Sequence, residues 1–335
     1  MWHRGIIAEV IAELEPDRFA NTALNQMVAR LRAGDVRALA RAISVVEGGL
    51  PGATELLAAC RASSEYSLRI GVTGPPGAGK STLVDQMARR LRQEGKTVAV
   101  LAVDPTSPYT GGALLGDRIR MQDLAGDEGV YVRSVASRGA TGGITRTAGD
   151  VCAVMEAAGR QVVVIETVGV GQDEVEIVGA AHTIVVLSPP GLGDDIQAIK
   201  AGILEIADIH VVSKADKPEA GAAVAALRGM LSLGASRPNS KWACPVLAVS
   251  SISGEHLEKL KFTIGQHWTH LHDSGEFAER QRYNSRTRIF NTARHSFQQQ
   301  FEEHADVLEA QLQAVIKREA DPRFAAQVLL GWKRG

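Results

Sequence analysis

The sequence is short of cysteine and of net charge, and each shortage excludes a class of protein. Its three cysteines, Cys60, Cys152 and Cys244, lie far apart in a chain of 335 residues, so a disulfide framework is not expected. The formal net charge of −1 gives no overall basic field for nucleic acid or an anionic membrane. Hydrophobic residues at 45% and charged residues at 22% indicate an ordinary globular protein.

Long hydrophobic runs are also missing. No run approaches the roughly 18 apolar residues that a membrane-spanning helix needs. The N-terminal stretch MWHRGIIAEVIAELEPD carries Glu9, Glu13 and Glu15 among its apolar residues, which predicts an amphipathic helix rather than a signal peptide. The basic stretch 279–295 has the spacing of a solvated or packed helix face rather than of an RNA site. We therefore expect a soluble cytoplasmic protein that binds neither membranes nor nucleic acid.

Hydrophobic periodicity divides the chain into three regions. Residues 1–66 have helical spacing without strand-like runs, which predicts an N-terminal helical extension. Residues 67–272 alternate helical stretches with short β-branched runs, the pattern of an α/β domain with a mostly parallel sheet covered by helices on both faces. Residues 273–335 are helical again and predict a C-terminal arm. The strand-like runs are LRIGVT, TVAVLAVD, VYVRSV, QVVVIE, TIVVLS, DIHVVS and PVLAVS.

The strongest motif follows the first of these runs. Gly74-x-x-x-x-Gly79-Lys80-Ser81 lies between a predicted strand and a predicted helix, which is the context that a phosphate-binding loop requires. Glycines let backbone N–H groups wrap the phosphates at the start of the helix. Lys80 would reach the β- and γ-phosphates and Ser81 would offer an oxygen to Mg²⁺. The motif predicts a P-loop NTPase fold.

Acidic residues follow two other strand-like runs. Asp104 ends TVAVLAVD and Glu166 ends QVVVIE, so both should lie at the carboxyl edge of the sheet beside the phosphate loop. A hard cation takes oxygen ligands there, directly or through water. Glu166-Thr167-Val168-Gly169 takes the place of the Asp-x-x-Gly of common GTPases. Asp117, in LLGDRIRM, is a third candidate, although each acid is also consistent with a simple cap.

The choice between guanine and adenine depends on Ser213-Lys214-Ala215-Asp216. The usual guanine motif is Asn-Lys-x-Asp, in which the Asp carboxylate accepts two hydrogen bonds from guanine that adenine cannot donate. Asp216 keeps that acceptor and Lys214 keeps the stem that packs on the base. Ser213 in place of Asn is expected to cost about 1 kcal/mol of affinity without changing the preference. Ser250-Ser251-Ile252 ends the last strand-like run, where GTPases place a backbone N–H on the guanine oxygen.

These motifs resemble, in order and form, those of the MeaB/ArgK-type (MMAA-like) P-loop GTPases. The matching stretches are GVTGPPGAGKSTL, AVDPTSP, LLGDRIRM, SRGATGG, ETVGVGQDE and PPGLGDDIQAIKAGILEIADIHVVSKAD, and the resemblance spans about residues 20–270. It implies a GTPase that chaperones an adenosylcobalamin-dependent acyl-CoA mutase, with GTP hydrolysis gating cofactor delivery and protection. It also implies Mg²⁺ and a homodimer formed through the C-terminal helices, which fits Phe290 and Phe297 as a packing stripe.

The resemblance also implies roles for individual residues. Lys80, Glu166 and Asp104 are the expected catalytic residues, and GLGDDIQAIK is the expected partner-sensing segment, with Asp194 and Lys200 as its charged members. Ser81, Asp104, Asp117 and Glu166 are the expected Mg²⁺ ligands. The expected GTP-binding residues are Gly74, Pro75, Pro76, Gly77, Ala78, Gly79, Lys80, Ser81, Thr82, Lys214, Asp216, Ser250, Ser251 and Ile252.

Three other functions stay open at this point. A phosphate loop also serves small-molecule kinases, although a kinase has no need of guanine-reading loops. A nickel-delivery GTPase would carry a Cys/His metal motif, and the only histidine cluster is HWTHLH, with His267, His270 and His272. We expect these histidines at the surface or in an interface. The third alternative is a regulatory switch that hydrolyses GTP negligibly.

Overall fold

The fold is known from a computed structural model, which describes residues 22–61, 66–104, 126–136, 143–167, 176–191, 201–233, 241–303, 305–329 and 331. Residues up to Asn284 form one compact unit and residues from Ser285 onward form a second. The two units are described separately below. The predicted boundaries at 66/67 and 272/273 stay predictions.

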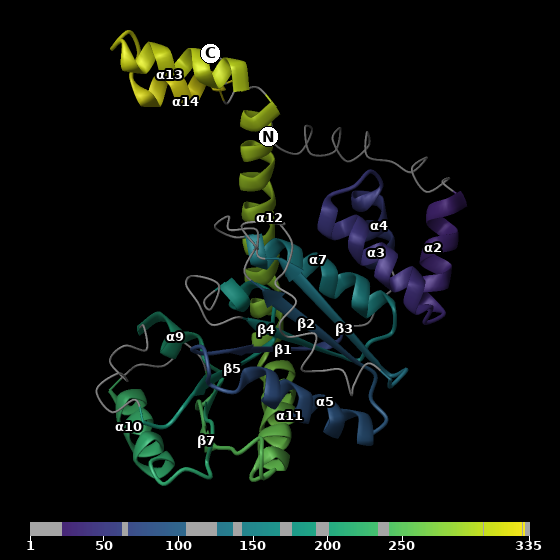
Figure 1. Cartoon of the computed structure of the whole chain (residues 1–335), viewed down its shortest axis with the longest axis vertical. Helices are drawn as coiled ribbons and strands as arrows, with labels where there is room; N and C mark the ends of the chain where they lie inside the picture. The colour runs from purple at the N-terminus through teal and green to yellow at the C-terminus, as the bar shows by residue number, and fades with distance from the viewer. Residues whose placement is uncertain are drawn as a thin grey trace. The chain divides into compact units, whose positions relative to one another are not determined.

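Seven strands of the first unit form one parallel sheet in the order β3-β2-β4-β1-β5-β6-β7 (Figure 1). All seven strand-like runs of the sequence are strands, and the α/β class with a mostly parallel sheet is confirmed. The strands are β1 (Leu68–Thr73), β2 (Val98–Asp104), β3 (Val130–Ala136), β4 (Val162–Thr167), β5 (Thr183–Ser188), β6 (Ile209–Val212) and β7 (Val246–Ala248). β1, β4, β5 and β6 are almost entirely buried, which explains their continuous apolar sequences.

Helices cover both faces of the sheet. On one face, α5 (Lys80–Gln93) and α11 (Leu257–Ser274) contribute Leu83, Val84 and Ile264 to a core that includes Val72 and Val164. On the other face, a second core takes side chains from α7 (Gly143–Ala157), α9 (Ala201–Ile206) and α10 (Ala220–Ser232) together with the short helix η3 (Ile177–Gly179). The two cores hold the sheet between helical layers, as the alternating pattern predicts.

In the described part of the N-terminal region, from residue 22 to 61, three helices precede the sheet, in agreement with the periodicity of the sequence. They are α2 (Thr22–Arg32), α3 (Val36–Gly48) and α4 (Ala53–Arg61). Asp35 starts α3 by accepting hydrogen bonds from the backbone N–H groups of Arg37 and Ala38, and Gly49 ends it in the left-handed conformation. Leu39 and Leu56 are fully buried in the same core as α7, so these helices add a further layer over that face.

The chain ends in α12 (Glu276–Glu303), α13 (Ala305–Ile316) and α14 (Pro322–Leu329). The first turns of α12, up to Asn284, belong to the first unit. Within the second unit, α13 and α14 contact each other, and α13 has no buried residue among those described. Apolar side chains stay exposed there, including Phe290, Leu312 and Ile316. No helix in the described part of the chain is both long and apolar enough to cross a membrane.

Candidate nucleotide-binding site

The predicted site residues converge because the strands are parallel. Parallel strands all end at the same edge of a sheet, and ligands of open α/β sheets bind beyond this carboxyl edge. β2 ends at Asp104, β4 carries Glu166 next to its last residue, and β1 leads directly into the phosphate loop. β4 lies between β1 and β2, so these three strand ends are neighbours.

The loop between β1 and α5 has the backbone that a phosphate cradle needs. Gly74 has a φ of 141°, and a Cβ there would come 2.3 Å from the Leu187 carbonyl oxygen, so only glycine fits. Gly77 and Gly79 are also in the left-handed region. Gly79 caps α5 without a side-chain hydrogen bond, so the first N–H groups of the helix face the loop, as an anion site requires.

Lys80 lies over this loop. Its Nζ donates to the carbonyl oxygens of Gly74, at 2.8 Å, and Pro75, at 3.0 Å, and its side chain is buried. A buried ammonium held by two carbonyls is preorganised for phosphate oxygens, which would exchange for these neutral acceptors. The structure therefore brings Lys80 to the loop as the motif predicts.

Ser81 and Glu166 meet at the first turn of α5. The Ser81 hydroxyl donates to Glu166 Oε1 at 2.6 Å, and Glu166 is only 3% exposed. In the sheet Glu166 is level with Val72 of β1, two residues before the phosphate loop begins, on the face that α5 covers. The pairing of these two predicted ligands, 85 residues apart in the sequence, supplies oxygen donors of the type that a hard cation prefers.

Several other predicted site residues lie outside the described part of the chain. They are Asp117, Asp194 and Lys200, and for Asp104 only the backbone is described. Asp104 ends β2 immediately beside the level of Thr167, because Val103 is paired with Thr167 in the sheet. Its position at the strand end matches the prediction, and its role as a ligand stays a prediction.

The predicted guanine loops also lie together. Lys214 has a φ of 53°, and the N–H of Ala215 donates to the Val249 carbonyl at 3.2 Å, which joins the loop after β6 to the loop after β7. The Ser250 hydroxyl donates to Asp216 Oδ1 at 2.6 Å. This hydrogen bond, helped by a backbone N–H and by Lys217 and Lys214, lowers the pKa of Asp216. The carboxylate is therefore kept ionised and oriented, which guanine recognition requires.

Ser213, which takes the place of the motif's asparagine, contacts the end of β5. Its buried hydroxyl donates weakly to the Ser188 carbonyl at 3.5 Å, and its backbone N–H donates to the same oxygen at 2.9 Å. These bonds close the end of β6 onto β5. The backbone N–H groups of Ser213 and Ala215 thus tie the loop after β6 to the ends of the neighbouring strands.

Ser250 is more important to this loop than its sequence position indicated. Its backbone N–H donates to the Glu255 carbonyl at 3.1 Å, and its hydroxyl accepts from the N–H of Ser253 while donating to Asp216. Ser250 thus orients Asp216, and the backbone of Ser251 and Ile252 is left as the predicted contact with the guanine oxygen. A serine at the end of the last strand-like run, two residues beyond β7, was the signal of this role in the sequence.

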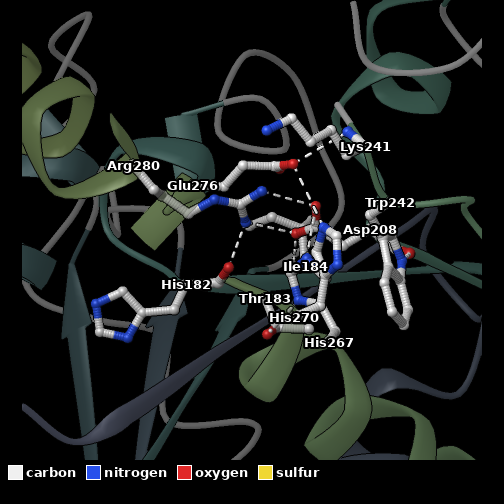
Figure 2. A network of polar contacts seen from close by, with 10 residues as sticks. All are labelled: His182, Thr183, Ile184, Asp208, Lys241, Trp242, His267, His270, Glu276 and Arg280. Atoms are coloured by element: carbon white, nitrogen blue, oxygen red, sulfur yellow. Dashed lines mark hydrogen bonds and ion pairs between the residues drawn. The ribbon is translucent and has the colours of Figure 1, made fainter. Parts of the chain in front are cut away.

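A second polar cluster lies at the opposite, amino edge of the sheet (Figure 2). Asp208, 2% exposed, accepts two hydrogen bonds from Arg280 of α12, at 2.7 and 2.8 Å, and one from the N–H of Ile184. Arg280 also donates to the His182 carbonyl. The Trp242 indole N–H donates to the Asp208 carbonyl oxygen at 2.8 Å. Nothing in the sequence pattern predicted this cluster.

Two histidines of HWTHLH, His267 and His270, belong to that cluster; the expected surface position is wrong for the buried His267, whereas His272 is exposed as expected. His267 is fully buried, hydrogen-bonded to the Thr183 hydroxyl at 2.8 Å, with its other ring nitrogen 3.5 Å from Asp208. His270 lies 3.3 Å from Glu276. The expectation failed because Asp208 supplies an acidic partner from a distant part of the sequence. Within the described ranges, no three His, Cys, Asp or Glu side chains form a metal-binding group.

Three features together define a P-loop GTPase. They are the phosphate loop, the acid at the end of β4 that is hydrogen-bonded to Ser81, and the Lys-x-Asp loop that is bonded to the loop after the last strand. The model of one family, described as methylmalonyl-CoA mutase-associated GTPase MeaB, matches residues 39–306, and the chain belongs to this family. The chain is accordingly a GTPase that binds guanine nucleotides.

Known relatives agree with this assignment. A Pyrococcus horikoshii protein named as a GTPase is 40% identical over 92% of this chain and 97% of its own. GTPase ArgK of Escherichia coli is 39% identical over 76% and 79%. The methylmalonic aciduria type A homolog of Mus musculus is 33% identical over 79% and 65%. A crystal structure named as a LAO/AO transport system kinase covers 93% of this chain and 98% of its own, with a TM-score of 0.71 and 29% identity.

Proposed function

We propose that this GTPase uses GTP binding and hydrolysis to gate the delivery of adenosylcobalamin to a cobalamin-dependent acyl-CoA mutase, and to protect the loaded mutase. The partner is methylmalonyl-CoA mutase or a relative of it. The observation that carries the proposal is the MeaB family match over residues 39–306, whose description names the association with that mutase. The expected cytoplasmic location is part of the same proposal.

The phosphate loop binds the triphosphate of the nucleotide, and the two guanine loops bind its base. The triphosphate lies against residues 74–82, where the N–H groups of the loop and Lys80 neutralise its charge. Asp216 accepts from the guanine ring N–H and amine, and Lys214 packs its stem on the base. Ser250 holds Asp216 in place while Ser251 and Ile252 present backbone N–H groups to the guanine oxygen.

Ser81 and Glu166, together with Asp104 and Asp117, would hold Mg²⁺. The close pair of a hydroxyl and a buried carboxylate fits such a cation, because both are oxygen donors already within 2.6 Å of each other. When bound, Mg²⁺ neutralises charge on the phosphate oxygens. Glu166 then orients or deprotonates the attacking water, directly or through a second water, and Lys80 stabilises the charge that develops at the γ-phosphate.

Hydrolysis, rather than transfer to a small molecule, is the reaction that these observations favour. The guanine loops would be superfluous in a small-molecule kinase, and the relatives in Pyrococcus and Escherichia coli are named GTPases. The crystal structure named as a LAO/AO transport system kinase shares the fold with this chain, and the activity in that name belongs to that protein.

Two further elements couple the site to partners in this proposal. The segment GLGDDIQAIK begins directly beyond β5, at the carboxyl edge, and its Asp194 and Lys200 respond to the mutase by ordering groups around the γ-phosphate. The C-terminal arm, residues 273–335, pairs two copies of the chain. Its exposed apolar side chains, such as Phe290, Phe297 and Leu312, give the arm a surface that a second copy would bury.

The test uses purified candidate mutases and the full-length chain. We expect GDP and a non-hydrolysable GTP analogue to change the affinity for a cobalamin-binding mutase by different factors, and the mutase to stimulate GTP turnover. Asp194→Ala and Lys200→Ala should keep basal turnover and lose most of the stimulation. If no cobalamin-dependent mutase binds or stimulates the wild-type chain, the proposed partner is wrong.

A further inference from the structure

Two buried hydroxyl groups face each other where β1 and β4 end. Thr167 Oγ1 donates to Thr73 Oγ1 at 2.9 Å, and the two residues are 1% and 0% exposed. Their cross-strand partners are Val186 and Val103, and valine has nearly the same shape as threonine. Burying two hydroxyls instead of two methyl groups is unfavourable unless the hydroxyls are hydrogen-bonded to each other. Valines would fill the same space without needing such a bond, so the threonine pair suggests a role beyond filling the core.

The position of the pair in the sheet suggests that role. Backbone pairing of β1 with β4 runs up to Val72 and Glu166, and the two threonines follow one position later. Thr73 is still paired with Val186 of β5, and Thr167 with Val103 of β2. Thr73 is therefore still fixed by β5 and Thr167 by β2. The hydroxyl bond links β1 and β4 to each other at the point where their backbone pairing ends, next to the nucleotide site.

The pair also lies on the face opposite to the cation ligands. Side chains alternate along a strand, and Gly71, two residues before Thr73, faces Ile177 on the α7 side. Glu166 is level with Val72, which packs against α5, and it reaches Ser81 on that side. The hydroxyl bond therefore braces the strand ends from one face while the Glu166 carboxylate acts at the other.

We propose that Thr73 and Thr167 are a positioning pair for GTP hydrolysis. Their hydrogen bond fixes the distance between the phosphate loop, which begins at Gly74, and the strand end that carries Glu166. Without it the Glu166 carboxylate moves relative to Ser81, and small displacements of a catalytic group are costly, about 100-fold in rate for 1 Å. The inference rests on the proposed roles of Glu166 and Ser81.

The phosphates should remain well bound when this pair is broken, because they are held by the loop itself and by Lys80. Thr167→Val and Thr73→Val keep the shape and remove the bond. We expect each to lower kcat by about 10-fold while leaving the KM for GTP within about threefold. The Mg²⁺ concentration that half-saturates tight binding of a GTP analogue should rise several-fold, a readout that does not depend on turnover.

Two further comparisons separate positioning from loss of stability. Thr167→Ser restores the hydroxyl and should recover kcat and the Mg²⁺ dependence. Thr183→Val is the matched control, because Thr183 is fully buried and its hydroxyl also has a partner, His267, at the other edge of the sheet. It should lower the melting temperature to a similar extent without changing kcat. The double variant Thr73→Val/Thr167→Val should be no worse than either single variant, since both remove one bond.

Two results would overturn the inference. One is a kcat and a Mg²⁺ dependence within twofold of wild type in both valine variants; the other is an equal loss of kcat in Thr183→Val. Failure of the underlying site assignment looks different. In that case Glu166→Gln itself would turn over GTP at the wild-type rate, whatever the threonine variants do.

Discussion

The two edges of the sheet both concentrate charged residues, but they use charge in opposite ways. At the carboxyl edge, Asp216 is exposed and oriented by Ser250, and the Lys80 ammonium donates to the carbonyl oxygens of Gly74 and Pro75. At the amino edge, Asp208 is buried and already engaged by Arg280 and backbone groups. Removing one partner of a charge pair that is satisfied within the protein destabilises the fold, whereas removing a charge held ready for a ligand weakens binding.

The largest expected effect is on stability, at the amino edge. Arg280→Ala leaves the Asp208 carboxylate in its buried site without its bidentate partner, which should cost about 3–5 kcal/mol of unfolding free energy. Arg89→Ala is the matched control, because Arg89 is 38% exposed and pairs with Asp85 one helical turn away, so it should cost at most about 1 kcal/mol. Thermal and urea unfolding measure both. Equal losses in the two variants would contradict the distinction between the edges.

A variant at the carboxyl edge should show the converse behaviour. Lys80→Ala removes the cation that the loop holds for the phosphates, and we expect turnover to fall by about 100- to 1,000-fold with weakened GTP binding. The fold should tolerate the change. Lys96→Ala, at an exposed lysine after α5, should leave turnover unchanged. Turnover of the Lys80→Ala protein within twofold of wild type would contradict the assignment of the phosphate-binding site.

Acid should destabilise the fold by protonating two buried histidines, His210 and His182. Burial lowers the pKa of His210 on β6 to about 4, with a backbone hydrogen bond at Leu204 opposing the shift, and burial also places the pKa of His182 well below its usual value. The folded state therefore resists protonation of these histidines. The stability that the neutral histidines contribute is fully present above about pH 6.5 and is lost as the pH falls towards 4.

For His210 alone this loss amounts to about 2 kcal/mol between pH 7 and pH 5. His210→Leu should therefore flatten the dependence of unfolding free energy on pH over that range. His256→Asn is the control, because His256 is exposed and asparagine tolerates its left-handed backbone. An unchanged slope in His210→Leu would show that other groups set the acid sensitivity.

The smallest expected effect is at Ser213. Its hydroxyl makes only a 3.5 Å contact with Ser188, so Ser213→Asn should keep or improve GTP affinity, by at most about fivefold. Isothermal titration with GDP and a GTP analogue measures this change. A loss of more than tenfold would mean that the bonds of Ser213 to β5 are essential to the guanine loop.

The carboxyl edge could be predicted from the sequence because its residues are local. Gly74, Gly79 and Lys80 occur in one short motif, and the strands on either side have continuous apolar runs. The acid at the end of β4 follows from the rule that parallel strands share an edge. Glu166 and Ser81 were therefore placed together correctly, although they are 85 residues apart.

The amino edge could not be predicted, because the contacts of Asp208, which hold the cluster together, join residues far apart in the chain. Asp208 and Arg280 are separated by 72 residues. The sequence predicts an exposed histidine run at His267, because it does not show that Asp208 lies beside this histidine in the fold. The Thr73–Thr167 bond has the same character, since a threonine in a β-branched strand gives no signal of its partner. Pairings between side chains depend on the packed fold rather than on motif spacing.

The most direct test of the account is the competition between nucleotides for the wild-type chain and for Asp216→Asn. The central claim is that Asp216, held by Ser250, selects guanine although Ser213 replaces the usual asparagine. In wild type, GTP should displace a fluorescent GDP probe at concentrations at least about 100-fold lower than ATP, since each charged hydrogen bond contributes about 1.5–3 kcal/mol. In Asp216→Asn, GTP affinity should fall and xanthosine triphosphate affinity should rise. Equal competition by ATP and GTP in wild type would contradict the account.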